Sequence, residues 1–195
     1  MIATDSIEAL AKFRERRWTY EELRNELPES NTPVELWDGE LVMSPSPSFN
    51  HQRIVFEFQR ALDDWARDNE AGTTIGAPID MVLSSGRVVQ PDVAFVATER
   101  LDIIDEIING PADLIAEVIS PGSRNRDRIE KRDLYQRHGV KEYWLINPEA
   151  KTVEVLKLEE NEYRLHGCWS QAERAESNLL DGFWVQVARL FGTAQ

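Results

Sequence analysis

The length, composition and charge of the chain exclude several classes of protein. With 195 residues, of which 42% are hydrophobic and 29% charged, the sequence favours one globular domain over a disordered, collagen-like or coiled-coil protein. The single cysteine, Cys168, and three scattered histidines exclude an intrachain disulfide scaffold and a structural zinc module. A net charge of −13 argues against general electrostatic affinity for nucleic acid.

The sequence carries no signal for a membrane. Residues 1–18 are charged throughout and lack an apolar signal core. No segment approaches the roughly 20 consecutive apolar residues that a membrane-spanning helix needs. We therefore expect a cytoplasmic protein with no membrane partner.

The first predicted elements are a short helix and a hairpin. Thr19 and Glu22 have the spacing of a capping box, which predicts that a short helix begins there. Asp38 and Gly39 lie between the two apolar halves of 34–43, and glycine supplies the positive φ that a hairpin turn requires. Two short strands are therefore expected on either side of this turn.

A long helix and several strands follow. Apolar residues recur at helical spacing over 48–69, which predicts an amphipathic helix packed on a sheet. Residues 73–83 and 87–96 are typical of strands, with Ser85-Gly86 as the turn between them. Because proline cannot donate to a sheet, Pro91 is expected at a bulge or an edge.

The second half of the chain predicts further strands around one helix. A short helix is expected over 101–108, a buried strand over 112–120 and a helix over 124–138 that stops at Gly139. Later strands are expected over 140–146, 151–158 and 162–169, and a short closing helix within 181–191. The pattern indicates a single α/β domain over 1–195 with a mixed β-sheet flanked by helices, in which 1–30 form an N-terminal helical extension.

Two acids stand in otherwise apolar strands and are the first candidates for chemistry. Asp92 lies in the segment VVQPDVAFV and Glu117 in LIAEVIS. A carboxylate in a buried strand is costly to ionise unless it is paired, hydrogen-bonded or bound to a metal. If the two strands are neighbours, both acids can form an oxygen site that suits Mg²⁺ or Mn²⁺. The alternative is that each acid satisfies a turn amide or an arginine such as Arg124.

Lys131 is the next candidate, on the helix that follows Glu117. Asp127, Lys131, Tyr135 and His138 recur at spacings of four, four and three, so they share a face of that helix. A lysine that looks back toward the acids could orient an attacking water and offset charge on a phosphate. The alternative is an ordinary i,i+4 pair with Asp127 on a solvated surface.

One segment departs from the acidic character of the chain. Residues 120–141 contain seven basic and three acidic residues, which gives a local charge of +4. Guanidinium groups suit phosphate, so Arg124, Arg126 and Arg128 are the candidate nucleic-acid contacts. An ordinary solvated helix face is nearly as good an explanation of this pattern.

The candidate residues fall into motifs that resemble a known family. In chain order the motifs are Pro91-Asp92, the run Glu117-Val118-Ile119-Ser120-Pro121, the spaced set Asp127, Lys131 and Tyr135, and the run from Gly139 to Trp144. Together they resemble the Uma-type family of putative restriction endonucleases, which is similar to the PD-(D/E)xK nucleases. The resemblance extends from about Val34 to about Val155, and four motifs in the right order make it specific.

The resemblance implies a fold and a set of roles. The fold is a restriction-endonuclease-like core with a mixed sheet flanked by helices, an N-terminal helix and hairpin, and C-terminal antiparallel strands. Asp92 and Glu117 hold Mg²⁺ or Mn²⁺ in this scheme. Because Ile119 occupies the usual lysine position of the superfamily, Lys131 takes over its role from the following helix. A further acid is expected from the hairpin, with Glu40 preferred over Glu35.

The implied function is metal-dependent hydrolysis of phosphodiester bonds in DNA by an endonuclease. His51, near the start of the long helix, could approach the same pocket, although a lone histidine is more often structural. A rival reading is an inactive nuclease-like module that binds nucleic acid or a protein partner, which the acidic charge and the absent E-x-K lysine favour. A third is a metal-binding protein that acts on another phosphate compound. The sequence leaves open whether the substrate is DNA or RNA. It also leaves open whether the protein forms a homodimer.

Overall fold

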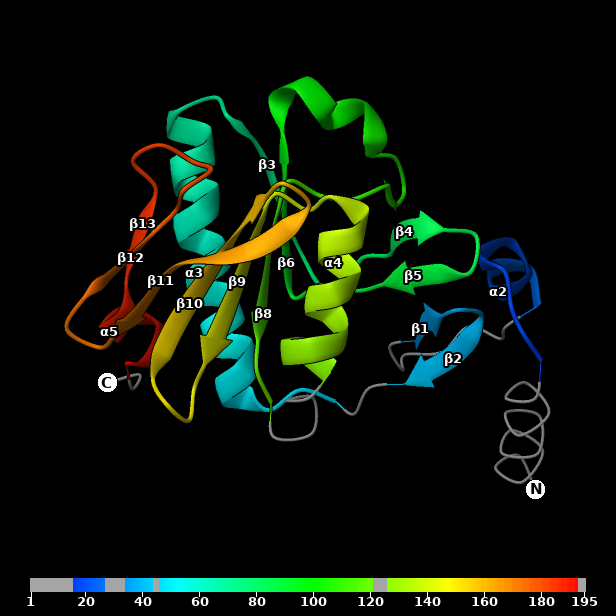
Figure 1. Ribbon diagram of the computed structural model, residues 1–195, viewed down its shortest axis with the longest axis horizontal. Coiled ribbons are helices and arrows are strands. Elements are labelled where there is room, and N and C mark those ends of the chain that lie inside the picture. Colours follow the sequence, from blue (N-terminus) through cyan, green and yellow to red (C-terminus); the bar gives the residue numbers. More distant parts are fainter. Residues whose placement is uncertain (1–15, 27–33, 44–45, 121–125, 193–195) are drawn as a thin grey trace.

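A computed structural model describes residues 16–26, 34–43, 46–120 and 126–192 of the chain. Figure 1 shows a six-stranded sheet with helix α3 (Phe49–Asp68) behind it and helix α4 (Arg132–His138) in front. A five-stranded sheet lies beside this core, on the right of the view, and a two-stranded sheet lies on the left. The expected α/β class, with mixed sheets flanked by helices, is confirmed.

The six-stranded sheet has the order β11-β10-β9-β8-β6-β3 and is mixed. Strands β8 and β9 are parallel, while all other neighbours are antiparallel. The chain passes from β8 to β9 through a π-helical segment, η2, and then α4, as a parallel pair requires a crossover. The strands are β3 Gly72–Gly76, β6 Val93–Ala97, β8 Leu114–Val118, β9 Glu142–Asn147, β10 Thr152–Glu159 and β11 Glu162–Ser170.

The five-stranded sheet has the order β2-β1-β5-β4-β7 and begins with the predicted hairpin. Asp38 and Gly39 both have positive φ angles, of 53° and 80°, as the tight turn between β1 and β2 requires. Its strands are β1 Val34–Trp37, β2 Glu40–Met43, β4 Met81–Ser84, β5 Arg87–Val89 and β7 Ile108–Asn109. The two-stranded sheet pairs β12 Arg174–Glu176 with β13 Trp184–Gln186.

Two segments that were expected to be continuous strands are instead divided between the sheets. Residues 73–83 contribute to β3 in the larger sheet and β4 in the smaller, and residues 87–96 contribute to β5 and β6 in the same way. Pro78 and Pro91 lie at the two breaks, where a residue without an N–H cannot continue the ladder. The breaks place the segment before β6 at the junction of the two sheets.

Side chains cap the first turns of two helices, at Thr19 and at Ser48. The Thr19 N–H donates to Glu22 Oε2 and the Glu22 N–H donates to Thr19 Oγ1, which confirms the capping box. The Ser48 hydroxyl accepts the His51 N–H at the start of α3. The remaining helices are α2 Tyr20–Glu26, η1 Thr98–Ile103, η2 Arg126–Lys131 and α5 Val187–Phe191.

The prediction of a helix over 101–108 is wrong. A 3₁₀ helix, η1, ends at Ile103, and the chain then turns back so that Ile104 bridges Ile108 at the start of β7. Four isoleucines lie within 103–108, and their β-branched side chains favour extended backbone over a regular helix. The expected end of the later helix at Gly139 is confirmed, since this residue closes α4 with a φ of +81°.

Strand β8 separates two hydrophobic cores, which fixes the direction of its acid. Leu114, Ala116 and Val118 pack with α3 in one core. Ile115 and Ile119 pack with Leu134 and Tyr135 of α4 in the other. Because side chains alternate along a strand, Glu117 faces α4.

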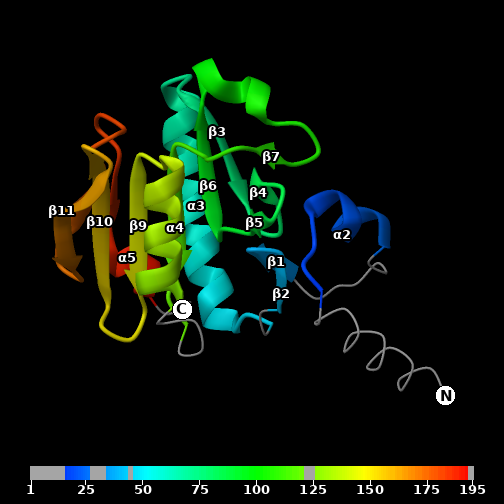
Figure 2. The ribbon, with the colours of Figure 1, turned by 45° about the vertical axis from the view of Figure 1, so that its right-hand side comes forward.

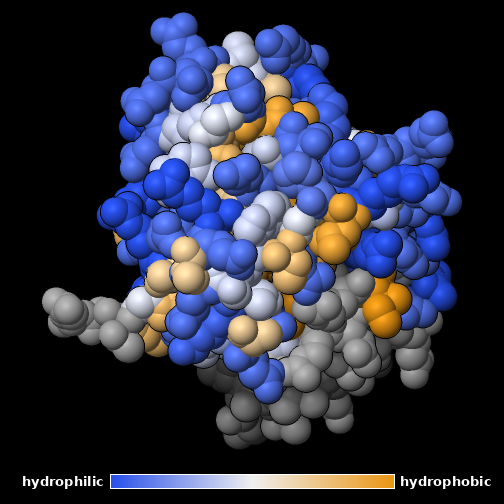
Figure 3. Space-filling view, turned by 60° about the vertical axis from the view of Figure 1, so that its left-hand side comes forward, coloured by the Kyte–Doolittle hydropathy of each residue, from blue (hydrophilic) through white to orange (hydrophobic). Residues whose placement is uncertain are grey.

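A third, small core lies at one edge of the molecule. Figure 2 shows α2 beside the β1–β2 hairpin, where Trp18, Leu23, Leu36 and Val88 form a third core. The surface in Figure 3 is mostly hydrophilic, with small hydrophobic patches separated by polar side chains. On this face no large hydrophobic patch stands out among the described residues.

Candidate active site

A buried acid, amine and phenol meet near the end of β8. The Lys131 Nζ and the Tyr135 hydroxyl both lie 2.7 Å from Oε1 of Glu117 and donate to it. All three residues are buried, with exposed fractions of 3% for Glu117, 6% for Lys131 and 0% for Tyr135. The crossover explains the contact, because η2 and α4 return over the face of β8 to which Glu117 points.

Burial and the neighbouring charge keep the phenol protonated. Desolvation raises the pKa of Tyr135 well above its usual value, and the negative charges of Glu117 and Glu35 add to this effect. The Tyr135 hydroxyl therefore keeps its proton near neutral pH and donates it to Glu117.

A second carboxylate reaches this cluster from the other sheet. Glu35 in β1 is 4% exposed, and its Oε1 lies 3.9 Å from Lys131 Nζ. The same oxygen accepts the Gln90 N–H at 3.0 Å, while Oε2 accepts the Trp37 indole N–H at 3.1 Å. Glu35 is thus held by the hairpin and by the segment that joins the two sheets.

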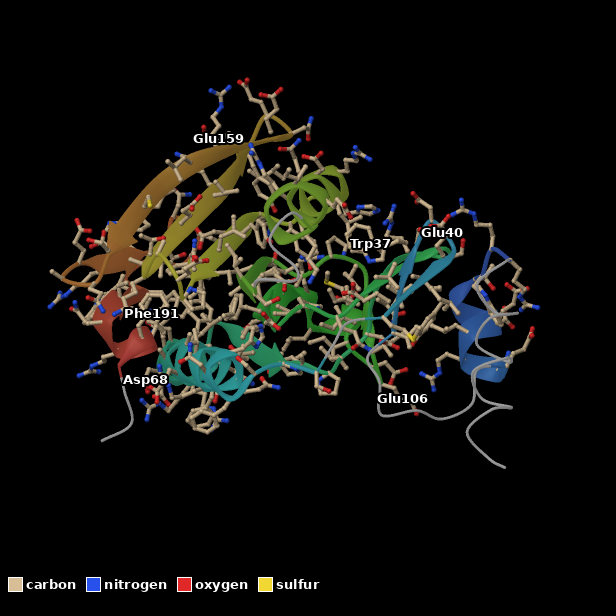
Figure 4. The ribbon with its side chains drawn as sticks, turned by 90° about the horizontal axis from the view of Figure 1, so that it is seen from below. Trp37, Glu40, Asp68, Glu106, Glu159 and Phe191 are labelled. Carbon is tan, nitrogen blue, oxygen red and sulfur yellow. The ribbon has the colours of Figure 1, made fainter. Side chains whose placement is uncertain are left out.

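The structure does not bring Glu40, the acid that was preferred in the hairpin, to this cluster. Glu40 follows the two-residue turn directly and pairs with Arg17 at 2.9 Å, with 63% of its side chain exposed. Figure 4 shows Glu40 at the outer part of the hairpin and Trp37 on the side toward α4. Glu35 reaches the interior because it lies at the other end of β1, where Gln90 meets the hairpin.

Asp92 lies directly before β6 and is tied to β8. Val93 pairs with Ala116 in the antiparallel ladder, so continuing the register by one residue places Asp92 opposite Glu117. Asp92 Oδ2 accepts the Val118 N–H at 2.8 Å and lies 3.2 Å from Nε2 of His51 at the start of α3. The expected approach of His51 to the pocket is therefore seen.

The donor set suits a hard divalent cation. Glu35 and Glu117 both lie within 3.9 Å of Lys131, and the register of β6 and β8 places Asp92 opposite Glu117. Within the described residues, no group of three or more His, Cys, Asp or Glu side chains lies close enough to hold a metal alone. Mg²⁺ keeps several waters and needs only one or two carboxylates, so Asp92 and Glu117 fit it.

The predicted nucleic-acid contacts lie outside what the structure describes. Arg124 precedes the described part of the crossover. The backbone of Arg126 and Arg128 belongs to η2, but their side chains, like that of Asp127, are outside the described residues. His138 does not join the site, because its Nδ1 lies 2.8 Å from the Leu134 carbonyl oxygen.

Two residues of the site were not expected from sequence. Trp37 and Gln90 both hold Glu35, the first through its indole and the second through its backbone. Nothing in their residue types indicates this role. The signal that could have favoured Glu35 over Glu40 is the one that identified Asp92 and Glu117, namely an acid enclosed by apolar residues, here in the segment VELW.

Comparison with known proteins shows the family and the fold of the chain. The family model of the Uma2 putative restriction endonucleases matches residues 19–188, and the chain belongs to this family. The crystal structure of a putative nuclease of the DUF820 group from Anabaena variabilis ATCC 29413 superposes with a TM-score of 0.75 at 18% identity. The match covers 89% of this chain and 97% of that one, so the two share a nuclease-like fold.

Two further findings are negative. A search of curated proteins found no match to the chain. Among the helices of the described residues, none has the length and apolar character needed to cross a membrane.

Proposed function

We propose that the protein is a Mg²⁺-dependent endonuclease that hydrolyses phosphodiester bonds in DNA. The observation that carries the proposal is the buried contact of Lys131 with Glu117, with Asp92 opposite Glu117 in the ladder. Membership of the Uma2 family supports the same reaction class.

The residues of the chain have distinct roles in this proposal. Asp92 and Glu117 hold the cation, and Glu35, on the other side of Lys131, takes the part first expected of Glu40. Lys131 orients the attacking water and offsets charge on the phosphate. When bound, Mg²⁺ supplies Lewis acidity and lowers the pKa of a coordinated water. Arg124, Arg126 and Arg128 are the proposed contacts to the DNA backbone.

A second candidate function is a nuclease-like module that binds nucleic acid or a protein without cutting. The net charge of −13 favours it, because a strongly acidic body repels a polyanion. The direct ion pair of Lys131 with Glu117 favours it too, since this lysine already has a carboxylate partner.

Incubation with supercoiled plasmid, linear duplex and single strands separates the two functions. We expect cleavage with Mg²⁺ or Mn²⁺ and none with a chelator. Glu117→Gln and Asp92→Asn should each reduce the rate on the order of 100-fold or more. Asp113→Asn is the matched control, because Asp113 is a buried acid at the other end of β8. Binding without cleavage by the folded wild type would establish the second function.

A further inference from the structure

The core between the larger sheet and α4 contains three tyrosines in contact. The rings of Tyr135 and Tyr143 meet edge to face with centroids 5.2 Å apart, and those of Tyr143 and Tyr163 lie 6.1 Å apart. The exposed fractions of these three residues are 0% for Tyr135 and Tyr143 and 5% for Tyr163. The packing of the three rings therefore fixes the directions of the Tyr135 and Tyr163 hydroxyls, at the two ends of the row.

The two outer tyrosines donate to different kinds of acceptor. The Tyr163 hydroxyl donates to the Val140 carbonyl oxygen at 2.8 Å, a contact within the fold. The Tyr135 hydroxyl donates to Glu117 Oε1 at 2.7 Å, a contact within the site. Tyr135 and Tyr163 are thus two buried phenols of one aromatic cluster, and Tyr135 is the one that donates to Glu117.

Glu117 Oε1 receives two donors that differ in rigidity. Lys131 and Tyr135 are four residues apart, so η2 and α4 present both groups to the same oxygen. The lysine ammonium ends a flexible four-carbon stem and can follow a carboxylate that turns. The phenol cannot follow, because its ring is held between Glu117 and Tyr143. The hydroxyl therefore donates to Glu117 Oε1 from a fixed position in the core.

We propose that Tyr135 is a positioning residue whose hydroxyl orients Glu117 for the binding of a divalent cation. The inference rests on the proposed function, since it assigns Glu117 to the cation. Groups that hydrogen-bond a metal-ligating carboxylate commonly change metal affinity by about 10- to 100-fold when they are removed. Tyr135 makes this bond from within the packed core, without being a ligand itself.

The test compares Tyr135→Phe with Tyr163→Phe by calorimetric titration with Mn²⁺ and Mg²⁺. Each variant loses one buried hydroxyl from the same aromatic cluster and keeps its ring. We expect Tyr135→Phe to bind the cation about 10- to 100-fold more weakly than the wild type. Tyr163→Phe should bind the cation with unchanged affinity. Its melting temperature should fall, as that of Tyr135→Phe does, because each variant loses one buried hydrogen bond.

Kinetics on plasmid DNA give a second measure. Tyr135→Phe should lower kcat at a fixed cation concentration and leave the KM for DNA unchanged, because the buried phenol does not reach the substrate. Excess cation should restore part of kcat, which it cannot do for a loss caused by unfolding.

The possible outcomes distinguish the two proposals. Equal cation affinity in Tyr135→Phe and the wild type would overturn the positioning role and leave the nuclease proposal standing. Equal losses in both variants would also overturn it, because they would show a general effect of weakening the aromatic cluster. A wild type that binds neither cation would refute the metal-dependent function itself.

Discussion

The two ends of strand β8 each bury a carboxylate, and the surroundings of the two differ. Asp113 comes directly before the strand and is 1% exposed, while Glu117 lies near its end and is 3% exposed. Asp113 accepts bonds from Arg100 at 2.9 Å and from the Ala97 N–H at 2.9 Å, and it pairs with Lys141 at 2.8 Å. One carboxylate thus meets two cations.

At the other end one ammonium lies near two carboxylates. Lys131 Nζ is 2.7 Å from Glu117 Oε1 and 3.9 Å from Glu35 Oε1. The side chains of Arg100 and Lys141 are 31% and 52% exposed, whereas that of Lys131 is 8% exposed. The charged partners of Asp113 are therefore more exposed to solvent than Lys131, which lies in the interior against Glu117 and Glu35.

A fourth buried acid shows that burial alone does not mark a site. Glu142 in β9 is 0% exposed and accepts bonds from the Trp144 indole, the Ser177 hydroxyl and two backbone N–H groups. These neutral donors tie the segment after β12 to the sheet. The comparison teaches that neutral donors alone can satisfy a buried acid, whereas at the Glu117 end buried groups of opposite charge from both sheets and the crossover meet.

The largest expected effect contrasts the two lysines. Lys131→Met removes the cation between two buried carboxylates and should lower the free energy of unfolding by about 3–5 kcal/mol. Lys141→Met should cost no more than about 1 kcal/mol, because Lys141 is half exposed and Asp113 keeps Arg100 and Ala97. Urea denaturation of both variants without metal measures the difference, and equal losses would refute the contrast.

The next effect concerns stabilisation by the cation. At a concentration of 100 times the dissociation constant, a bound cation should stabilise the wild type by about 2.7 kcal/mol. Asp92→Asn should abolish this gain and leave the metal-free protein no less stable, since its amide oxygen can still accept the Val118 N–H. Thermal melts with and without Mn²⁺ test this. An undiminished gain in Asp92→Asn would locate the cation elsewhere.

The Asp113 end should instead respond to acid. Burial alone would raise the pKa of Asp113, but Ala97, Lys141 and Arg100 together lower it below its usual value of 3.8. A lowered folded-state pKa contributes stability above 3.8, and this contribution is lost as the pH falls through the folded-state pKa. The stability difference between wild type and Asp113→Asn should therefore be constant near neutral pH and shrink below 3.8. Urea midpoints across this range provide the measurement.

The smallest effect separates the two acids of the hairpin. Glu40→Gln should change stability by less than about 1 kcal/mol and leave cleavage unchanged, because Glu40 is exposed beside Arg17. Glu35→Gln should lower turnover on the order of tenfold, since it alters the surroundings of Lys131. If Glu40→Gln had the larger effect on cleavage, the assignment of Glu35 would be wrong.

Local signals in the sequence determined most of the secondary structure. The capping box of Thr19 and Glu22, the Asp38-Gly39 turn and the stop at Gly139 each depend on neighbouring residues, and each appears as expected. The spacing of apolar residues predicted α3, and the nearly continuous apolar run over 112–120 predicted β8. The unusual acids Asp92 and Glu117 were also visible, because a charge in an apolar strand needs a partner.

Only the tertiary structure decided how these elements combine into a site. Whether Pro78 and Pro91 bend one sheet or divide two depends on pairing with strands distant in sequence, which no local pattern encodes. The choice between Glu35 and Glu40 depends on Gln90, a residue far along the chain that meets only one end of the hairpin. The partner of Lys131 was likewise fixed by the crossover from β8, because long-range packing sets which face of a helix meets which strand.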